Sequence, residues 1–147
     1  MKKYVLLGGI LCLLFSYTLG CSAPAADASV DVDLTVLSRT MVYAEAADMT
    51  NNPDNYIGKT VKMSGLYGSS QYDQTGRLFH YVLIEDAAAC CQQGFEFVWN
   101  GEHIYPDDYP EETTQIEIVG VFQSYEVSGN TYYCLAVDNI LVLNSSQ

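Results

Sequence analysis

The spacing of apolar residues before the middle of the chain predicts one short helix. Val42, Ala46 and Met49 recur at i, i+4 and i+7, so they share one helical face. Ser38 is the expected N-cap of this helix, which ends near Met49. Pro53 disfavours helical geometry at the residue before it and closes the segment. We expect the apolar face to cover one end or flank of the sheet that follows.

The chain after this helix has the pattern of antiparallel strands joined by turns. Polar and apolar residues alternate over 60–64, and Gly65 within that alternation indicates a bulge or bend where a sheet curls. Residues 68–76 have the composition of a polar hairpin loop. Apolar residues on both faces of 77–85 indicate a closed or covered sheet. The five expected strands are residues 60–64, 77–85, 95–99, 115–127 and 131–143.

One long connection lies between the third and fourth expected strands. Residues 102–113 contain Pro106, Pro110 and five carboxylates, and this composition argues against a regular helix there. We therefore expect an acidic loop that carries Tyr105 and Tyr109.

The passage from helix to first strand carries a resemblance. Asn52-Pro53-Asp54-Asn55-Tyr56-Ile57-Gly58-Lys59-Thr60-Val61 has the form N-P-x-x-Y-x-G-K-x-V after a short helix. This arrangement resembles the start of small five-stranded barrels of the OB-like kind found in many bacterial envelope proteins. The resemblance implies a mainly β protein, with a five-stranded OB-like antiparallel barrel and one short N-terminal helix over residues 38–147.

The N-terminus has the pattern of a secretion signal. Lys2 and Lys3 precede an apolar run over 5–20, which is shorter than the roughly 20 residues that span a bilayer. The residues up to Cys21 resemble the processing site of bacterial lipoproteins, which implies a signal peptide over 1–20 and a lipid on Cys21. A conventional secretory signal cleaved near Cys21 is the alternative.

Lipidation would determine where the protein resides. Two or more acyl chains hold a protein stably on a bilayer, so the mature chain would be anchored to the outer side of a membrane in the bacterial cell envelope. Small residues and aspartates dominate 21–37, and we interpret this stretch as a flexible tether without the bulk to pack.

The charge of the mature chain excludes one class of partner. All 18 acidic residues follow Cys21, against only four Lys and Arg residues, which gives a net charge of −14. Nucleic-acid affinity depends on Lys and Arg neutralising phosphates, so we expect no nucleic-acid binding.

Three cysteines remain if the signal is removed and Cys21 is lipidated. A disulfide from Cys134 to Cys90 or Cys91 would contribute about 2 to 4 kcal/mol. The alternative is a metal site for Zn or Cu, in which Cys90, Cys91 and Cys134 bind together with His80 or His103. Buried free thiols are the third interpretation.

The motifs of nucleophilic or metal-dependent enzymes are missing from the sequence, and we expect a non-enzymatic protein without a required cofactor. We expect His80 to face outward from the barrel and His103 to be solvated.

The sequence therefore favours a binding or accessory module that contacts an envelope protein, peptide or glycan. Its expected contact surface is a rim made by residues 86–94 and the loop over 101–113. Exposed tyrosines supply contact area at such surfaces, and Tyr72, Tyr125, Tyr132 and Tyr133 lie in or near expected hairpins. Tyrosine is also a common strand residue, and we expect one of Tyr132 and Tyr133 to face the core. The expected contact residues of the rim are Tyr105, Asp107, Asp108 and Tyr109. The alternative function is metal or thiol handling through the three cysteines.

Overall fold

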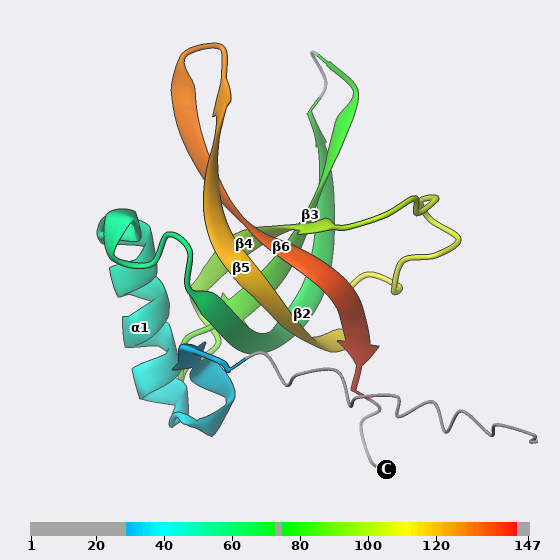
Figure 1. Cartoon of the computed structure of the whole chain (residues 1–147). Helices are drawn as coiled ribbons and strands as arrows, with labels where there is room; N and C mark the ends of the chain where they lie inside the picture. The colour runs from blue at the N-terminus through cyan, green and yellow to red at the C-terminus, as the bar shows by residue number, and fades with distance from the viewer. Residues whose placement is uncertain (1–28, 73–74, 144–147) are drawn as a thin grey trace, which may run out of the picture.

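Five long strands coil around a common core in the computed structural model, which describes residues 29–72 and 75–143. They are β2 (Thr60–Tyr72), β3 (Arg77–Glu85), β4 (Gln92–Trp99), β5 (Gln115–Val127) and β6 (Asn130–Val142). The strand order is β2-β3-β4-β6-β5, and β2 also pairs with β5, so the sheet closes on itself (Figure 1). The fold is OB-like and mainly β, as the sequence predicts.

Strand β2 closes the barrel by changing partners halfway along its length. Its first half pairs antiparallel with β5 up to Leu66, and its second half pairs antiparallel with β3 from Leu66 onward. Gly65 lies next to this change of partner. A strand that serves two neighbours in turn must bend across the barrel, which is where the alternation pattern placed a bend.

The core consists of the inward faces of these strands. Ile116, Ile118 and Phe122 of β5 are buried, as are Leu135 and Val137 of β6. These are the faces that the alternation of β5 and β6 predicts. Each such side chain contributes about 1.5 to 3 kcal/mol through burial, so the packed inward faces stabilise the barrel.

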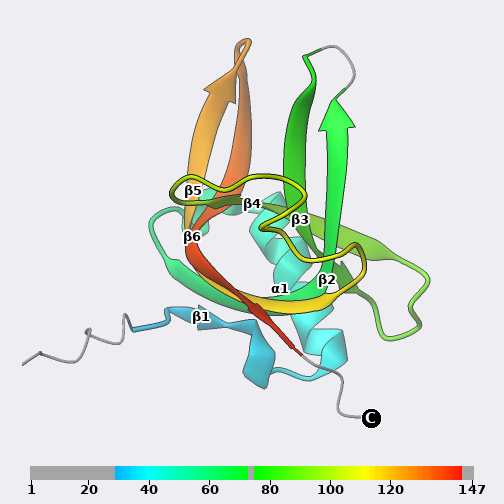
Figure 2. The same ribbon diagram turned by 90° about the vertical axis from the view of Figure 1, so that its right-hand side faces the viewer.

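Helix α1 (Arg39–Asn51) covers one end of the barrel. Ala46 and Met49 are fully buried under it, and Val42 packs against the core, so the predicted apolar face is confirmed. Figure 2 shows α1 behind the ring of strands, while the β4–β5 connection crosses the end that faces the viewer. The hydroxyl of Tyr56 donates hydrogen bonds to Glu45 and Asp48 and fixes the helix to the start of β2.

The segment expected to be a tether is partly built into the domain. Strand β1 (Val32–Asp33) pairs parallel with β2, and Leu34, in the short helix η1 (Leu34–Val36), is 1% exposed. The boundary at residue 37 is therefore wrong, because β1 pairs with β2, Leu34 is buried in the core and Val32 packs against it. Residues 1–28, which include the expected signal peptide and Cys21, lie outside the described residues.

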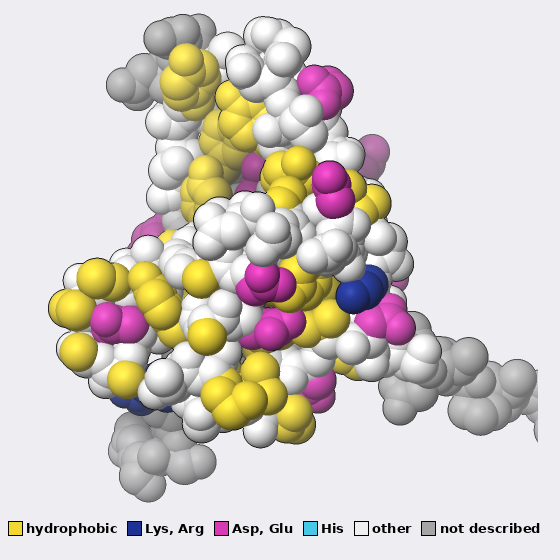
Figure 3. Space-filling view, turned by 90° about the vertical axis from the view of Figure 1, so that its left-hand side faces the viewer, with side chains coloured by type: hydrophobic (Ala, Val, Ile, Leu, Met, Phe, Trp, Pro, Cys, Tyr) yellow, Lys and Arg dark blue, Asp and Glu magenta, His cyan; other side chains and the backbone are white. Residues whose placement is uncertain are grey.

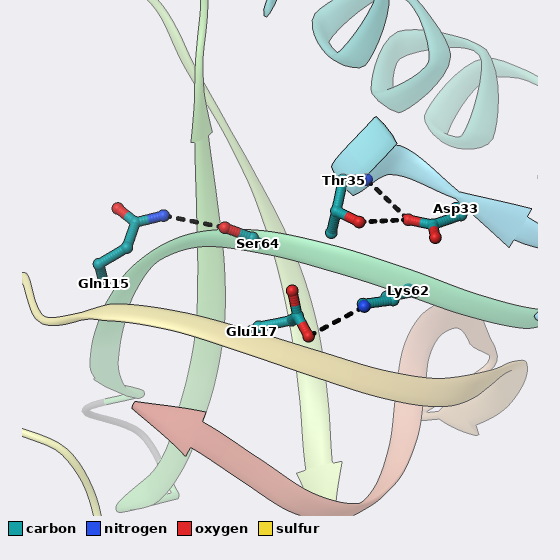
Figure 4. Close-up of polar contacts among 6 residues, drawn as sticks. All are labelled: Asp33, Thr35, Lys62, Ser64, Gln115 and Glu117. Atoms are coloured by element: carbon teal, nitrogen blue, oxygen red, sulfur yellow. Dashed lines mark hydrogen bonds and ion pairs between the residues drawn. The ribbon is translucent and has the colours of Figure 1, made fainter. Parts of the chain in front are cut away.

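Polar contacts hold the β1, β2 and β5 region together on its outer side (Figure 4). Lys62 of β2 pairs with Glu117 of β5 at 3.1 Å, and the amide of Gln115 donates to the Ser64 hydroxyl at 3.0 Å. Asp33 accepts hydrogen bonds from the backbone N–H and the hydroxyl of Thr35. The contacts of Lys62 with Glu117 and of Gln115 with Ser64 join β2 and β5, the two strands whose pairing closes the barrel.

Two strands are longer than the sequence predicts. Strand β2 continues to Tyr72, through residues expected to form a loop, and β4 begins at Gln92 rather than Phe95. The alternation of buried residues continues along β2 to Tyr67, whereas residues 70–72 and the start of β4 are mostly exposed and are defined by cross-strand backbone pairing. The consequence is a β2–β3 hairpin that projects beyond the barrel.

Among the charged side chains on the face that carries α1, Asp and Glu outnumber Lys and Arg (Figure 3). Figure 3 shows Asp and Glu spread over this face with few Lys or Arg side chains. Among the described residues, none of the helices is both long enough and apolar enough to cross a membrane.

Candidate functional site

Two hairpins rise side by side from the barrel and enclose a cleft. The β2–β3 and β5–β6 hairpins project in the same direction (Figure 1), and the hollow between them measures about 650 Å³. Ligand pockets usually measure about 300 to 1,000 Å³. The cleft is lined by Tyr72, Thr75, Arg77, Phe79, Tyr125, Val127, Ser128, Asn130 and Tyr132.

Aromatic rings form both walls of this cleft. On the β3 wall, Phe79 lines the cleft, and its ring stacks on that of Tyr81, which lies outside the lining, with centroids 6.5 Å apart. On the opposite wall, Tyr125 of β5 stacks on Tyr132 of β6 at 5.6 Å. Tyr132 is 45% exposed, so its ring is available to a ligand. Phe79 and Tyr81 are two residues apart and project from the same face of β3, whereas Tyr125 and Tyr132 are directly opposite each other in the register of β5 and β6.

Arg77 joins the two walls. Its guanidinium carbon lies 4.5 Å from the ring centroid of Phe79 and 5.0 Å from that of Tyr125. The same guanidinium pairs with Glu96 of β4 at 3.2 Å, and the Tyr125 hydroxyl also donates to Glu96. Residues from three strands thus meet in one network at the base of the cleft.

Glu96 is the electrostatic centre of this network. Only 10% of its side chain is exposed, and burial raises the pKa of its carboxyl group. The hydrogen bond from Tyr125 and the charge of Arg77 lower the pKa of Glu96 and so oppose the effect of burial. Burial also raises the pKa of Tyr125, and the bond to Glu96 raises it further. The network therefore favours a neutral phenol beside a paired carboxylate.

Cys134 is buried near this network and does not meet the other two cysteines. It pairs in register with Gln123 of β5, whose amide lies 3.6 Å from its sulfur, and burial raises the pKa of its thiol. Cys90 and Cys91 lie in the exposed turn between β3 and β4. Within the described residues all three are free thiols. The expected disulfide from Cys134 to Cys90 or Cys91 is therefore not formed in this structure, and the three thiols are not brought together as a metal site.

Cys90 and Cys91 instead approach Asp86. One ligand atom from each of the three residues lies within 4.8 Å of the others. Neither histidine belongs to this group. The adjacency of the two thiols is visible in the sequence. The approach of Asp86, four residues before Cys90, depends on how the turn folds back and is not visible there.

His80 is inside the barrel end, so the expectation that it faces outward is wrong. Its Nδ1 lies 2.7 Å from the hydroxyl of the fully buried Tyr67, and its ring stacks on Tyr109 at 4.0 Å. Burial lowers the pKa of His80. Every second residue of β3 faces inward, and His80 lies two residues before the buried Val82, so it faces the same way. Polar character alone therefore misassigned it.

His103 is also more constrained than expected. Its ring stacks on Trp99 with centroids 3.6 Å apart, and its Nε2 lies 3.0 Å from the carbonyl oxygen of Asn100. Stacking on the last residue of β4 fixes the start of the long connection that follows.

The connection between β4 and β5 contains no helix, as predicted, and it crosses the barrel end opposite α1 (Figure 2). Tyr109 packs on His80, whereas Tyr105 is 43% exposed and Asp107 is also exposed. Asp108 accepts a hydrogen bond from the backbone N–H of Ile104 at 2.7 Å, so it stabilises the loop itself.

The expected rim does not exist as one surface. Residues 86–91 precede β4 and residues 100–114 follow it, so the two segments leave opposite ends of the same strand. The hairpin tyrosines, Tyr125 and Tyr132, were a sequence signal for the cleft. Arg77 and Phe79 gave no signal, because the pairing of β3 with β2 that brings them opposite β5 is not visible locally.

A second hollow of about 470 Å³ lies beside η1, β2 and β3. Ser64, Gln115 and Glu117 contribute to its lining, and they already bind neighbouring side chains (Figure 4). It offers no stacked aromatic rings. The hairpin cleft is therefore the stronger candidate site.

No protein-family model matches the chain, and no curated protein matches it. Solved structures that are similar include the dimeric N-terminal domain of the PriB protein from Thermoanaerobacter tencongensis, at 15% identity and a TM-score of 0.36. That match covers 58% of this chain and 97% of the other chain. Another is the OBody NL8 bound to hen egg-white lysozyme, at 15% identity and a TM-score of 0.38, covering 60% and 99%.

Proposed function

We propose that this protein is a lipid-anchored, extracytoplasmic and non-enzymatic binding module of the bacterial envelope, whose hairpin cleft holds a neutral oligosaccharide. The observation that carries the proposal is the pair of aromatic walls around Arg77. Faces of OB-like barrels flanked by two hairpin loops are a recurrent binding surface for oligonucleotides and oligosaccharides.

The chemistry of the cleft favours a glycan over a nucleic acid. Flat rings such as Phe79 and Tyr132 can stack on the apolar face of a sugar, and Thr75, Ser128 and Asn130 offer hydrogen bonds to its hydroxyl groups. The single basic residue in the described lining, Arg77, is already paired with Glu96. A phosphate backbone would meet no free cation there, and the charge of −14 would repel it.

The first prediction concerns ligand binding. The chain should bind at least one member of a panel of neutral hexasaccharides built from glucose, mannose or N-acetylglucosamine. In an NMR titration, the largest chemical-shift changes should fall on residues that line the cleft. Tyr132→Ala should weaken that binding about two- to tenfold, since one stacked aromatic contact contributes about 0.5 to 1.5 kcal/mol in addition to the burial of apolar area. Tyr132→Phe should retain most of it.

Tyr105→Ala is the matched control, because Tyr105 and Tyr132 are 43% and 45% exposed and lie on different surfaces. A loss of binding with Tyr105→Ala alone would move the contact surface to the β4–β5 loop. Binding of a basic peptide in place of every sugar would make the partner a protein. Silence from the whole sugar panel would overturn the glycan proposal.

The second prediction concerns the anchor. Cys21→Ser should move the protein from the membrane fraction to the soluble or secreted fraction of the producing bacterium, because no acyl chain can then be attached. Cys134→Ser, which changes a thiol in the barrel, should leave the protein in the membrane fraction. Intact-mass measurement should show acyl chains on the first mature residue only when Cys21 is present. An unchanged distribution would indicate the conventional secretory signal.

A further inference from the structure

The turn between β3 and β4 brings two thiols and a carboxylate together at the surface. The sulfur atoms of Cys90 and Cys91 are 3.7 Å apart, and Oδ2 of Asp86 lies 3.1 Å from the sulfur of Cys90. Two sulfurs that each lie about 2.3 Å from a tetrahedral zinc ion are about 3.8 Å apart. The observed sulfur separation is therefore already that of two zinc ligands.

The backbone of the turn is folded around Asp86. Its Oδ1 accepts hydrogen bonds from the N–H groups of Ala88, at 3.1 Å, and Cys90, at 2.9 Å. The N–H of Asp86 donates to the carbonyl oxygen of Cys91 at 3.0 Å. These bonds engage one carboxylate oxygen and leave the other directed at the thiol. The three ligand atoms are thus positioned by the turn itself, so little ordering is required when an ion binds.

We propose that Asp86, Cys90 and Cys91 form a binding site for one Zn²⁺ ion, independent of the hairpin cleft and of the glycan proposal. Two thiolates and a carboxylate are a ligand set that suits zinc, whereas Cu⁺ prefers sulfur and nitrogen to a carboxylate oxygen. Both cysteines are exposed. The fourth position is therefore open to water or to a donor from another molecule, and the ion is exchangeable rather than structural.

Binding requires that both thiols lose their protons. Zinc replaces the proton that Cys90 donates to Asp86, and the carboxylate changes from hydrogen-bond acceptor to metal ligand. The other acid at the base of the turn, Glu85, accepts a hydrogen bond from Gln92 at 2.8 Å and stays outside the site. Zinc affinity should therefore rise with pH, with about two protons released per ion.

The experiment uses the mature chain purified from membranes in detergent, kept reduced, and titrated with Zn²⁺ against a coloured chelator. We expect one ion per chain. Cys90→Ser and Cys91→Ser should each weaken zinc binding about 100-fold, and Asp86→Asn about tenfold. Cys134→Ala and Asp107→Asn are matched controls that remove a thiol and a surface carboxylate elsewhere, and both should bind like the parent chain.

A second readout separates ligation from any effect on folding. Zinc should protect Cys90 and Cys91 from alkylation in the parent chain, while the far-UV circular dichroism of every variant stays unchanged. The site would be overturned by zinc affinity that survives Cys91→Ser, by an equal loss in Cys134→Ala, or by alkylation rates that zinc does not alter.

Discussion

Gly65→Ala is expected to lower the free energy of unfolding by about 3 kcal/mol, the upper part of the range for overpacking a dense interior. A Cβ atom at this position would lie 2.5 Å from the carbonyl oxygen of Leu83 and 2.7 Å from Cγ1 of Val82. The carbonyl belongs to the backbone of β3 and cannot turn aside. Strand β2 bends here to pass from β5 to β3, so relief of the clash would separate β2 from β3.

The measurement is a urea unfolding curve of Gly65→Ala beside one of Gly94→Ala. Gly94 makes the same chemical change in a strand, but its added Cβ would first meet the end of the Leu83 side chain at 3.3 Å. Gly94→Ala should change stability by less than about 1 kcal/mol. Because domains are stable by only about 5 to 15 kcal/mol, the loss at Gly65 should also raise the unfolded fraction at growth temperature. Equal midpoints for the two variants would contradict the proposed close approach of β2 and β3.

The strand period explains why so much of the barrel could be predicted. Alternation over 115–127 assigns Ile116, Ile118 and Phe122 to one face of the strand, and this is the face that packs into the core. Gly65 was recognisable because a residue without a side chain interrupts an otherwise regular alternation. Both signals, the alternation and its interruption at Gly65, come from residues close together in the sequence, so they can be recognised without knowing which strands pair.

The candidate site depends on placements that are not local. Leu34 is buried in the core and Val32 packs against it, because β1 pairs with β2, and the composition of the segment does not show this pairing. The cleft needs β3, β4 and β5 to be assembled before Arg77, Glu96 and Tyr125 can meet. The prediction of one rim was wrong for the same reason. The two loops are close in the sequence, but they lie at opposite ends of β4.

Arg77→Met is expected to destabilise the protein by about 2 kcal/mol at pH 7, because it leaves the nearly buried carboxylate of Glu96 without its cation. Methionine keeps the apolar length that packs beside Phe79, so the charge and its hydrogen bond are what the variant removes. The Arg77 side chain is 41% exposed, and solvent screening keeps the effect below that of a fully buried pair.

The pH dependence identifies Glu96 as the cause. Its folded pKa is raised by burial, and loss of Arg77 should raise it further. An acid whose folded pKa exceeds its unfolded pKa contributes most at low pH, and that contribution is lost as pH rises through the folded value. The penalty of Arg77→Met should therefore be small near pH 4, where Glu96 is protonated, and reach its full size above the raised pKa.

Thermal unfolding at pH 4 and pH 7 measures this difference, with Lys62→Met as the matched control. Lys62 pairs with Glu117 at 3.1 Å, and the two side chains are 28% and 22% exposed, respectively. Loss of the Lys62 charge should therefore lower the free energy of unfolding by less than about 1 kcal/mol. Adding Glu96→Gln to Arg77→Met should recover part of the loss at pH 7, because no charge is then stranded. A penalty that is equal at both pH values would mean that Arg77 acts only by stacking between Phe79 and Tyr125. The cleft would then be held by ring contacts alone, and Arg77→Met should weaken the hairpins without moving the pKa of Glu96.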